Sequence, residues 1–348
     1  MSAGEVIAVI GACEPERASL ARRWATRSHR PLVTASRLEG YPSAIEAAVT
    51  LASHPSLQTG VVIEFPSHVS VTDLIGALAD PDGPTRLMAV ACVADAAHLV
   101  RDLQRDDYVS QASAEHPGET DHMARALLTV TQLEFASTII LVNWASLDTP
   151  DLSTMMALVS HLNPHARLRL DHKEASLMPL LHAHSTAHAG AGWVKMLNGT
   201  FDPHMTDPRV SAVRYEQARP FHPERLQRVL DEKLDGKECG TIVRSSGFCR
   251  FATRPGITAH WDHVGTMISF SHLTLDHDRE ADDEPLALGQ DLIFIGLDVK
   301  NDALVAALDE AVLTDDELLA GPKAWQKFSD PFPAWHTVAR GAEDPAES

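Results

Sequence analysis

Four short and almost wholly apolar segments constrain the fold of the first half of this chain more than any other feature. They are residues 5–11, 60–65, 86–93 and 137–143. Segments of helical composition, such as residues 15–28, separate them. Apolar strands that alternate with helices pair in parallel and are covered on both faces. The pattern therefore predicts an α/β fold, a parallel sheet with helices on both faces.

The second half of the chain has a different rhythm. Residues 171–208 are rich in His, Ala, Gly and Asp with weak periodicity, which is typical of a linker, and one short helix is expected near residues 177–182. A small α+β domain with helices on one side of an antiparallel sheet is expected to follow. Its strands are predicted at residues 210–216, 240–253, 257–272 and 291–299, its helices at 222–234 and 301–312, and a capping box at 314–317.

These changes of rhythm divide the chain. The predicted parts are a first domain at residues 1–170, a His-rich linker at 171–208, a second domain at 209–340 and a polar tail at 341–348.

Composition and charge narrow the classes of function. The 348 residues include 48 acidic and 29 basic side chains, a formal charge of -19. An acidic surface repels phosphate groups, so direct binding to nucleic acid or to an anionic membrane is not expected. No apolar run approaches the roughly 18 residues of a membrane span, and the first residues lack a signal-peptide pattern. Four cysteines without a C-x-x-C pair favour the reducing cytoplasm, and Cys13 and Cys92 are expected to be buried.

The turn after the first predicted strand occupies the position of a phosphate-binding loop. Such a loop reads G-x-x-x-x-G-K-[ST], because glycine amides wrap the phosphates, lysine reaches them and the hydroxyl holds Mg²⁺. Gly11 is the first glycine, but Glu16, Arg17 and Ala18 stand at the other three positions. These changes argue against ordinary Mg-nucleotide hydrolysis. An ordinary turn between a strand and a helix explains the same residues equally well.

Several later segments resemble the CobW-type family of metal-handling GTPases. In the first half these are 61–67 (VVIEFPS), 93–98 (VADAAH), 132–136 (QLEFA), 141–147 (LVNWASL) and 162–167 (LNPHAR). The second half carries 219–225 (RPFHPER), 243–248 (VRSSGF), Trp261, 290–298 (QDLIFIGLD), 313–317 (LTDDE), 321–325 (GPKAW) and 330–335 (DPFPAW). The resemblance is firm from Arg219 onward and eroded before Pro150. Trp325, Phe332 and Trp335 are expected to be packing anchors, with Pro223 in a first helical turn.

The resemblance implies a P-loop-NTPase-like first domain, a CobW C-terminal domain and a nucleotide site, and it also locates the departures. Glu64 and Asn143 match the family, whereas Trp144 and Ser146 replace the lysine and aspartate of the guanine-reading N-K-x-D. The family's Cys-x-Cys-Cys metal motif is missing between Gly11 and Glu64. The candidate cofactor-binding residues are Gly11, Arg17, Ser19, Glu64 and Asn143. No catalytic residue is predicted, and the departures argue against GTP and Mg²⁺ as cofactors.

Histidines offer a separate candidate metal site. His182, His184 and His188 form the densest group among 19 histidines, and imidazoles in a loop can gather around Zn²⁺. His161, His165 and His172 lie upstream, and Asp276-His-Asp278 is a weaker candidate. The alternative is a solvated polar linker.

Three functions are compatible with these observations. The first is a non-hydrolysing adaptor in zinc homeostasis, since the resemblance includes an actinobacterial subgroup whose member recruits a ribosome-hibernation factor under zinc limitation. The second is a GTP-dependent metallochaperone that delivers zinc or cobalt to a client metalloprotein. The third is a regulator that binds nucleotide without hydrolysis. Each implies a protein partner, and the oligomeric state stays open.

Overall fold

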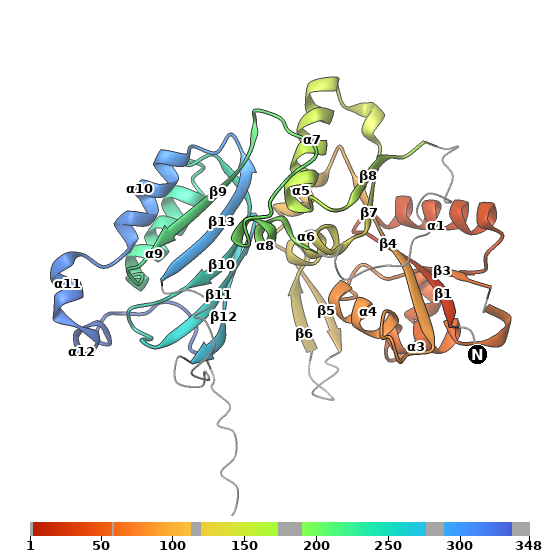
Figure 1. Ribbon diagram of the computed structural model, residues 1–348, viewed down its shortest axis with the longest axis horizontal. Helices are drawn as coiled ribbons and strands as arrows, with labels where there is room; N and C mark the ends of the chain where they lie inside the picture. Colours follow the sequence, from red (N-terminus) through yellow and green to blue (C-terminus); the bar gives the residue numbers. More distant parts are fainter. Residues whose placement is uncertain (1–2, 58, 113–119, 173–189, 276–288, 336–348) are drawn as a thin grey trace, which may run out of the picture.

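A computed structural model of the 348-residue chain describes residues 3–57, 59–112, 120–172, 190–275 and 289–335. Two lobes lie side by side along the long axis of the molecule (Figure 1). We call the described residues up to 172 the N-terminal lobe and those from 210 onward the C-terminal lobe. None of the helices in the described ranges is long and apolar enough to cross a membrane.

The N-terminal lobe is built on a six-stranded parallel sheet with the strand order β2-β3-β1-β4-β7-β8. The strands are β1 (Gly4–Ile10), β2 (Leu32–Val33), β3 (Val61–Glu64), β4 (Thr85–Asp95), β7 (Thr138–Val142) and β8 (Arg167–Leu170). The four apolar segments of the sequence form β1, β3, β4 and β7, which confirms the predicted parallel sheet. The edge strands β2 and β8 were not predicted, because they are short or alternate between arginine and leucine.

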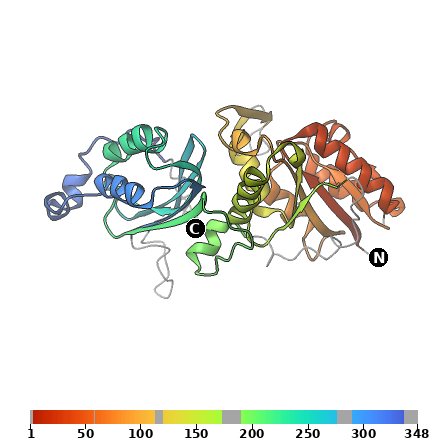
Figure 2. The same ribbon diagram turned by 90° about the horizontal axis from the view of Figure 1, so that it is seen from above.

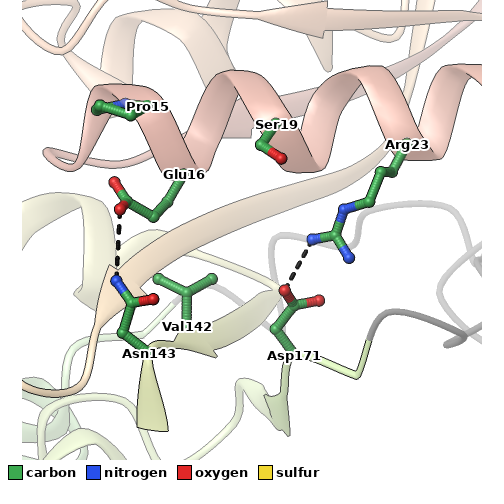
Figure 3. A pocket seen from close by; sticks show the side chains of 7 residues that line it. All are labelled: Pro15, Glu16, Ser19, Arg23, Val142, Asn143 and Asp171. Carbon is green, nitrogen blue, oxygen red and sulfur yellow. Dashed lines mark hydrogen bonds and ion pairs between the residues drawn. The ribbon is translucent and has the colours of Figure 1, made fainter. Parts of the chain in front are cut away.

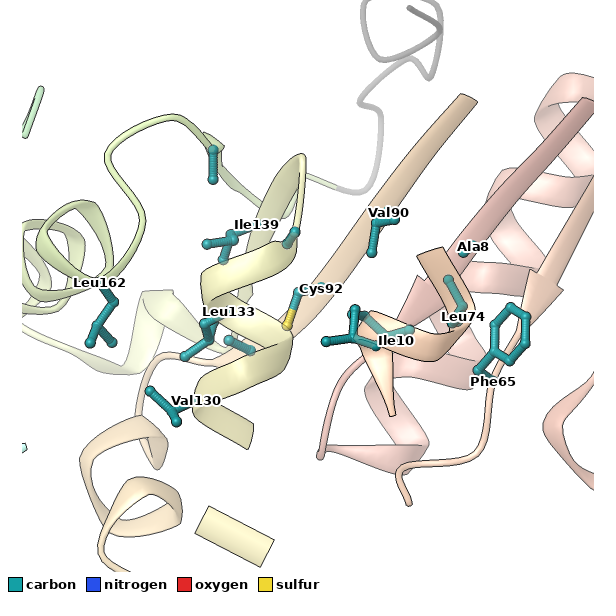
Figure 4. Close-up of a cluster of buried hydrophobic side chains, with 14 of the residues drawn as sticks. Ala8, Ile10, Phe65, Leu74, Val90, Cys92, Val130, Leu133, Ile139 and Leu162 are labelled. Atoms are coloured by element: carbon teal, nitrogen blue, oxygen red, sulfur yellow. The ribbon is translucent and has the colours of Figure 1, made fainter. Parts of the chain in front are cut away.

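Helices cover both faces of this sheet because successive residues of a buried strand point to opposite sides. On one side Ile7 and Val9 pack against α1 (Glu14–Ser28). On the other side Ala8 and Ile10 lie in a larger core with α3 (Ala44–Ala52), α4 (Val71–Leu78), α6 (Arg125–Phe135) and α7 (Thr149–Leu162) (Figure 4). The shorter elements of this lobe are α2 (Ala35–Leu38), α5 (Leu99–Leu103) and the hairpin β5 (Tyr108–Ala112) and β6 (Thr120–Ala124).

The C-terminal lobe is an antiparallel five-stranded sheet with the order β12-β11-β10-β13-β9. Its strands are β9 (Val210–Gln217), β10 (Thr241–Cys249), β11 (Ile257–Val264), β12 (Met267–Leu275) and β13 (Gln290–Leu297). Helices α9 (Pro223–Val229), continued by a π-turn at Leu230–Leu234, and α10 (Asn301–Ala311) cover one face around the buried Trp261. The predicted α+β arrangement is thus confirmed.

One strand prediction in this lobe was wrong. The segment 257–272, predicted as a single strand, is the hairpin of β11 and β12. Gly265 makes the turn in a left-handed conformation with φ of 60°. Alternation of polar and apolar residues continues on both sides of this turn, so the sequence pattern hides the reversal.

The second face of the C-terminal sheet packs directly on the N-terminal lobe. Val243, Ile293 and Ile295 belong to the same buried cluster as Leu158 and Leu162 of α7, so one hydrophobic core runs through both lobes. The views in Figures 1 and 2 place α6, α7 and α8 (Gly192–Leu197) between the two sheets.

Helix α8 lies within the segment predicted as a linker. A Cβ at Gly192 would come within 1.8 Å of the His161 carbonyl oxygen, so only glycine permits this approach. That end of the segment is therefore packed between the lobes. The short helix predicted near residues 177–182 falls outside the described residues.

Candidate functional site

The carboxyl ends of the parallel strands bring the predicted site residues of the N-terminal lobe to one edge of the sheet. Gly11 follows β1, Glu64 ends β3, Asp95 ends β4 and Asn143 follows β7. Ligands bind at this edge in open α/β sheets, because the loops after neighbouring parallel strands converge there.

Gly11 is required at this edge by packing alone. Its φ is 141°, and a Cβ here would lie 2.3 Å from the carbonyl oxygen of Val93 on the neighbouring strand. The glycine that resembles the start of a phosphate loop therefore has a structural explanation that needs no phosphate.

Arg17, at the lysine position of a phosphate loop, faces into the protein. The residue is 2% exposed. Its Nε lies 3.2 Å from Oε1 of Glu64 in an ion pair, and Nη1 donates to the Gly11 carbonyl oxygen. The second oxygen of Glu64 accepts from the backbone amide of Ala35 at 3.4 Å. The charge that a phosphate would need is already neutralised by a buried carboxylate.

Glu16 and Asn143 close the same edge from the outside. The Asn143 side-chain amide donates to Asp95 Oδ2 at 2.7 Å and to Glu16 Oε1 at 3.3 Å. Asn143 has a φ of 54°, a left-handed conformation that asparagine tolerates. Asp95 also accepts from the Ala97 amide at 2.9 Å. Two carboxylates thus share one amide at this edge, and their negative field repels anions.

A pocket of about 350 Å³ remains beside these residues, between α1 and the ends of β7 and β8. It is lined by Pro15, Glu16, Ser19, Arg23, Val142, Asn143 and Asp171 (Figure 3). Across it Arg23 Nη2 lies 2.7 Å from the Asp171 carboxylate. The Trp144 indole donates to the Asp171 carbonyl oxygen at 3.1 Å. Ser19 lines the pocket, whereas Arg17 and Glu64 lie behind it in the interior.

Three residues of this site were not predicted. Asp95 lies in the VADAAH segment and could have been found there, since carboxylates that end parallel strands face the binding edge. Arg23 and Asp171 carry no signal, because the two are 148 positions apart and only the fold brings them together.

The described residues offer no preformed metal centre. No group of three or more His, Cys, Asp or Glu side chains among them could hold a metal ion. Burial raises the pKa of Cys13 to about 12, and its thiol donates to the Val93 carbonyl oxygen at 3.2 Å. It therefore stays protonated and is a poor ligand. Cys92 is buried as predicted, and Cys13 is half-buried.

The histidines that were candidate metal ligands lie in different parts of the chain. His182, His184 and His188 lie outside the described residues, as does Asp276-His-Asp278. His161 is buried and bonded to the Ala157 carbonyl oxygen at 2.8 Å, and burial lowers its pKa. His172 packs edge-on against Trp144.

The matched residues of the C-terminal lobe hold the fold together. Arg225 binds both carboxylate oxygens of Glu317, at 2.8 and 2.7 Å. Pro223 is the first residue of α9, where its missing N–H costs nothing. Thr314 and Glu317 form the predicted capping box.

Phe332 and Trp335 pack against the C-terminal core, as predicted, whereas the contact of Trp325 lies within the closing segment. The Trp325 indole donates to the Glu317 carbonyl oxygen at 2.6 Å, and the Trp335 indole donates to the Phe270 carbonyl oxygen at 2.8 Å. The Phe332 ring lies 4.8 Å from the Phe270 ring. The contacts of Phe332 and Trp335 with Phe270 fold the C-terminal segment back onto the sheet.

Part of the C-terminal lobe matches a known domain, and two relatives match most of the chain. Residues 210–312 match the sequence profile of the cobalamin synthesis protein cobW C-terminal domain, so the chain carries this domain. The zinc-regulated GTPase metalloprotein activator 1 of Dictyostelium discoideum is 28% identical over 275 residues, 71% of this chain and 56% of the relative. The zinc chaperone Rv0106 of Mycobacterium tuberculosis is 29% identical over 282 residues, 74% of this chain and 65% of the relative.

The matched regions thus span between about half and two thirds of the length of these relatives. Among solved structures, the Zn(II)-bound YjiA GTPase from E. coli aligns with 90% of this chain and all of that chain, at 12% identity and a TM-score of 0.34. A TM-score at this level gives the alignment no weight on function.

Proposed function

We propose that this chain serves zinc homeostasis by acting on a protein partner, and that it does so without hydrolysing GTP. The names of its relatives, a zinc chaperone and a zinc-regulated GTPase metalloprotein activator, support the zinc-related part. The inward-facing Arg17, buried against Glu64, supports the second part.

The energetics at the sheet edge favour this proposal. For Arg17 to reach a phosphate, its pair with Glu64 must break, which leaves a carboxylate that is 4% exposed without its cation. Breaking a buried pair in this way costs about 3 to 5 kcal/mol. Glu16 and Asp95 add repulsion on the open side, because Asn143 holds both carboxylates there. A GTP molecule would have to overcome both terms before gaining any contact.

The loop at the position of the guanine-reading N-K-x-D motif is changed as well. The Asn143 amide is occupied by two carboxylates, Trp144 stands at the lysine position, and the Ser146 hydroxyl donates to the Asn143 carbonyl oxygen at 2.7 Å. A serine used in this way offers no carboxylate to the guanine N1 and N2 groups. The proposal therefore assigns no guanine specificity to this loop.

The proposed partner is a protein with a basic surface, since the chain has a formal charge of -19. A client metalloprotein fits this description, and so does the ribosome-associated hibernation factor implied by the sequence resemblance. Capture from zinc-starved and zinc-replete cells, followed by mass spectrometry, distinguishes the two.

A GTP-dependent metallochaperone is the second candidate. The relatives favour it directly, since one of them is named a GTPase. The pocket beside Ser19 and Arg23 also leaves space at the edge where GTPases hold their nucleotide.

One titration separates the candidates. Purified protein is titrated with GTP, GDP and ATP in the presence of Mg²⁺, with and without Zn²⁺, by calorimetry and phosphate release. The proposal predicts no binding with a Kd below about 1 mM, which corresponds to only about 4 kcal/mol. Micromolar GTP affinity with turnover would establish the second candidate, and micromolar affinity without turnover would establish a nucleotide-binding regulator.

A matched variant tests the cause. The triple substitution E16G/R17K/A18S restores the three missing residues of the phosphate loop. If the loop residues are responsible, the triple variant gains GTP affinity over the natural chain. The single substitution Thr26→Ala, at an exposed position of the same helix away from the pocket, leaves the three positions unchanged and serves as the control.

A further inference from the structure

Helix α6 touches both the loop that follows β3 and the C-terminal sheet. Residues two positions apart on a helix point to opposite sides. Gln132 and Glu134 are such a pair, and both are 2% exposed. They belong to the segment 132–136 singled out in the sequence, which none of the proposed nucleotide or metal chemistry uses.

Gln132 holds the loop after β3. Its Nε2 donates to the carbonyl oxygen of Ser67 at 3.1 Å. Ser67 lies three residues after Glu64, the glutamate that binds Arg17. The position of this loop is thus fixed from one side by the Arg17–Glu64 pair and from the other by α6.

Glu134 holds the C-terminal lobe. Its carboxylate accepts from Arg244 Nε at 2.8 Å and from Nη2 at 3.4 Å. Arg244, in β10, is 3% exposed and also donates to Asp262 and to the His263 carbonyl oxygen in β11. The glutamate of α6 is therefore the N-terminal lobe's contribution to a buried charge cluster that joins two strands of the other lobe.

The end of α6 is held rigidly between these contacts. The Asn163 side-chain amide donates to the carbonyl oxygens of Leu133, Glu134 and Ala136 at 2.8 to 3.0 Å. Leu133 itself is buried in the core shared by both lobes (Figure 4). A displacement of this turn on one side must therefore be transmitted to the other side, because close-packed interiors do not absorb it.

We infer that helix α6 couples the two lobes, so that the loop after β3 and the strands β10 and β11 change their local stability together. Gln132 makes the contact with the loop after β3, and Glu134 makes the contact with Arg244 in the C-terminal lobe. A partner that binds one lobe would thereby alter the other. The inference requires no nucleotide, so its failure is separate from a failure of the proposed function.

Amide hydrogen exchange tests the coupling directly, because exchange reports local opening residue by residue. Gln132→Met removes the contact with Ser67 and keeps the side-chain length. We expect exchange in residues 64–70 and also in residues 241–249 to become faster by about fivefold or more. Thr131→Ala is the matched control, since within the described residues the Thr131 hydroxyl donates to the Leu127 carbonyl oxygen of the same helix and to no other group. It should leave both segments unchanged.

The reciprocal variant is Arg244→Met, which should accelerate exchange in residues 64–70. If that variant does not fold, Asp262→Asn weakens the same cluster and takes its place. Faster exchange confined to the mutated lobe in both directions overturns the inference. An increase in residues 64–70 that is no larger than the increase in β1 also overturns it, because it reports global destabilisation rather than coupling.

Discussion

Two buried arginines occupy different settings, one at the edge of the parallel sheet and one at the interface between the lobes. Arg17 at the edge of the parallel sheet and Arg244 at the lobe interface are 2% and 3% exposed, and each binds a buried glutamate. Arg17 stands where the phosphate-loop pattern has lysine, whereas Arg244 matches the pattern of the C-terminal strand. The first pair closes a potential binding edge, and the second joins two lobes. The same kind of buried ion pair therefore blocks a binding edge at one place and holds two lobes together at the other.

The largest expected effect concerns the interface pair. Arg244→Met leaves Glu134 and Asp262 without their cation, and we expect the free energy of unfolding to fall by about 3 to 5 kcal/mol. Urea denaturation measures the change. The double substitution R244M/E134L removes the more deeply buried of the two uncompensated charges and should recover at least half of the loss. A loss below about 1 kcal/mol for Arg244→Met would mean that the pair does not hold the lobes together.

The next effect is a pH dependence beside this pair. Burial lowers the pKa of His263 from 6.5 to about 4, and the side chain lies 3.0 Å from the Ser245 hydroxyl. At pH values between about 4 and 6.5, His263 binds a proton in the unfolded chain but stays neutral in the folded chain. Stability therefore falls as pH falls from about 6.5 to about 4, by up to about 3 kcal/mol.

His263→Gln removes the titrating imidazole, so the free energy of unfolding should depend less on pH over the same interval. Urea midpoints measured every half unit of pH show the difference. An unchanged slope in the variant would assign the pH dependence to other groups.

A smaller effect is expected at the sheet edge. Arg17→Lys keeps the charge but not the fork that reaches both Glu64 and the Gly11 carbonyl oxygen, so stability should fall by about 1 to 2 kcal/mol. The same variant should gain no GTP affinity, because Glu16 and Asp95 remain. Thermal unfolding and calorimetric titration test the two parts. Tight GTP binding by this single variant would show that the edge is closed by Arg17 alone.

The smallest effect lies outside both regions. Hydrogen bonds from Arg225 hold the pKa of Glu317 at about 2, and Glu317 completes the capping box with Thr314. Glu317→Gln should cost about 1 kcal/mol at neutral pH. Because the folded-state pKa is lowered, this difference is present above about pH 4.5 and disappears as pH falls towards about 2. A difference that persists at low pH would point to packing instead of charge.

Part of this architecture follows from local sequence signals. The long apolar strands of the first sheet and the helix that begins at Pro223 are specified by neighbouring residues, so composition and spacing predict them. The hairpin turn at Gly265 is not, because the alternating pattern continues through it. The same limit applies to the two-residue strand β2, which is too short for a pattern.

The candidate site shows the limit more sharply. Sequence spacing places Gly11, Glu64 and Asn143 at one edge of the sheet, because each follows or ends a predicted strand. The direction of the Arg17 side chain depends on Glu64, 47 positions away, and no local signal contains that choice. The positions of residues along the chain thus predict where a site lies. Whether the protein's own side chains fill that site depends on long-range contacts.

The core that runs through both lobes bears on how such chains can be recombined. Val243, Ile293 and Ile295 of the C-terminal sheet are buried against α7 of the N-terminal lobe. A chimera that takes one lobe from a relative must therefore import the matching apolar face of the other lobe, or expose it to water. The two halves can diverge in what they bind at their outer surfaces, but they are inherited as a pair.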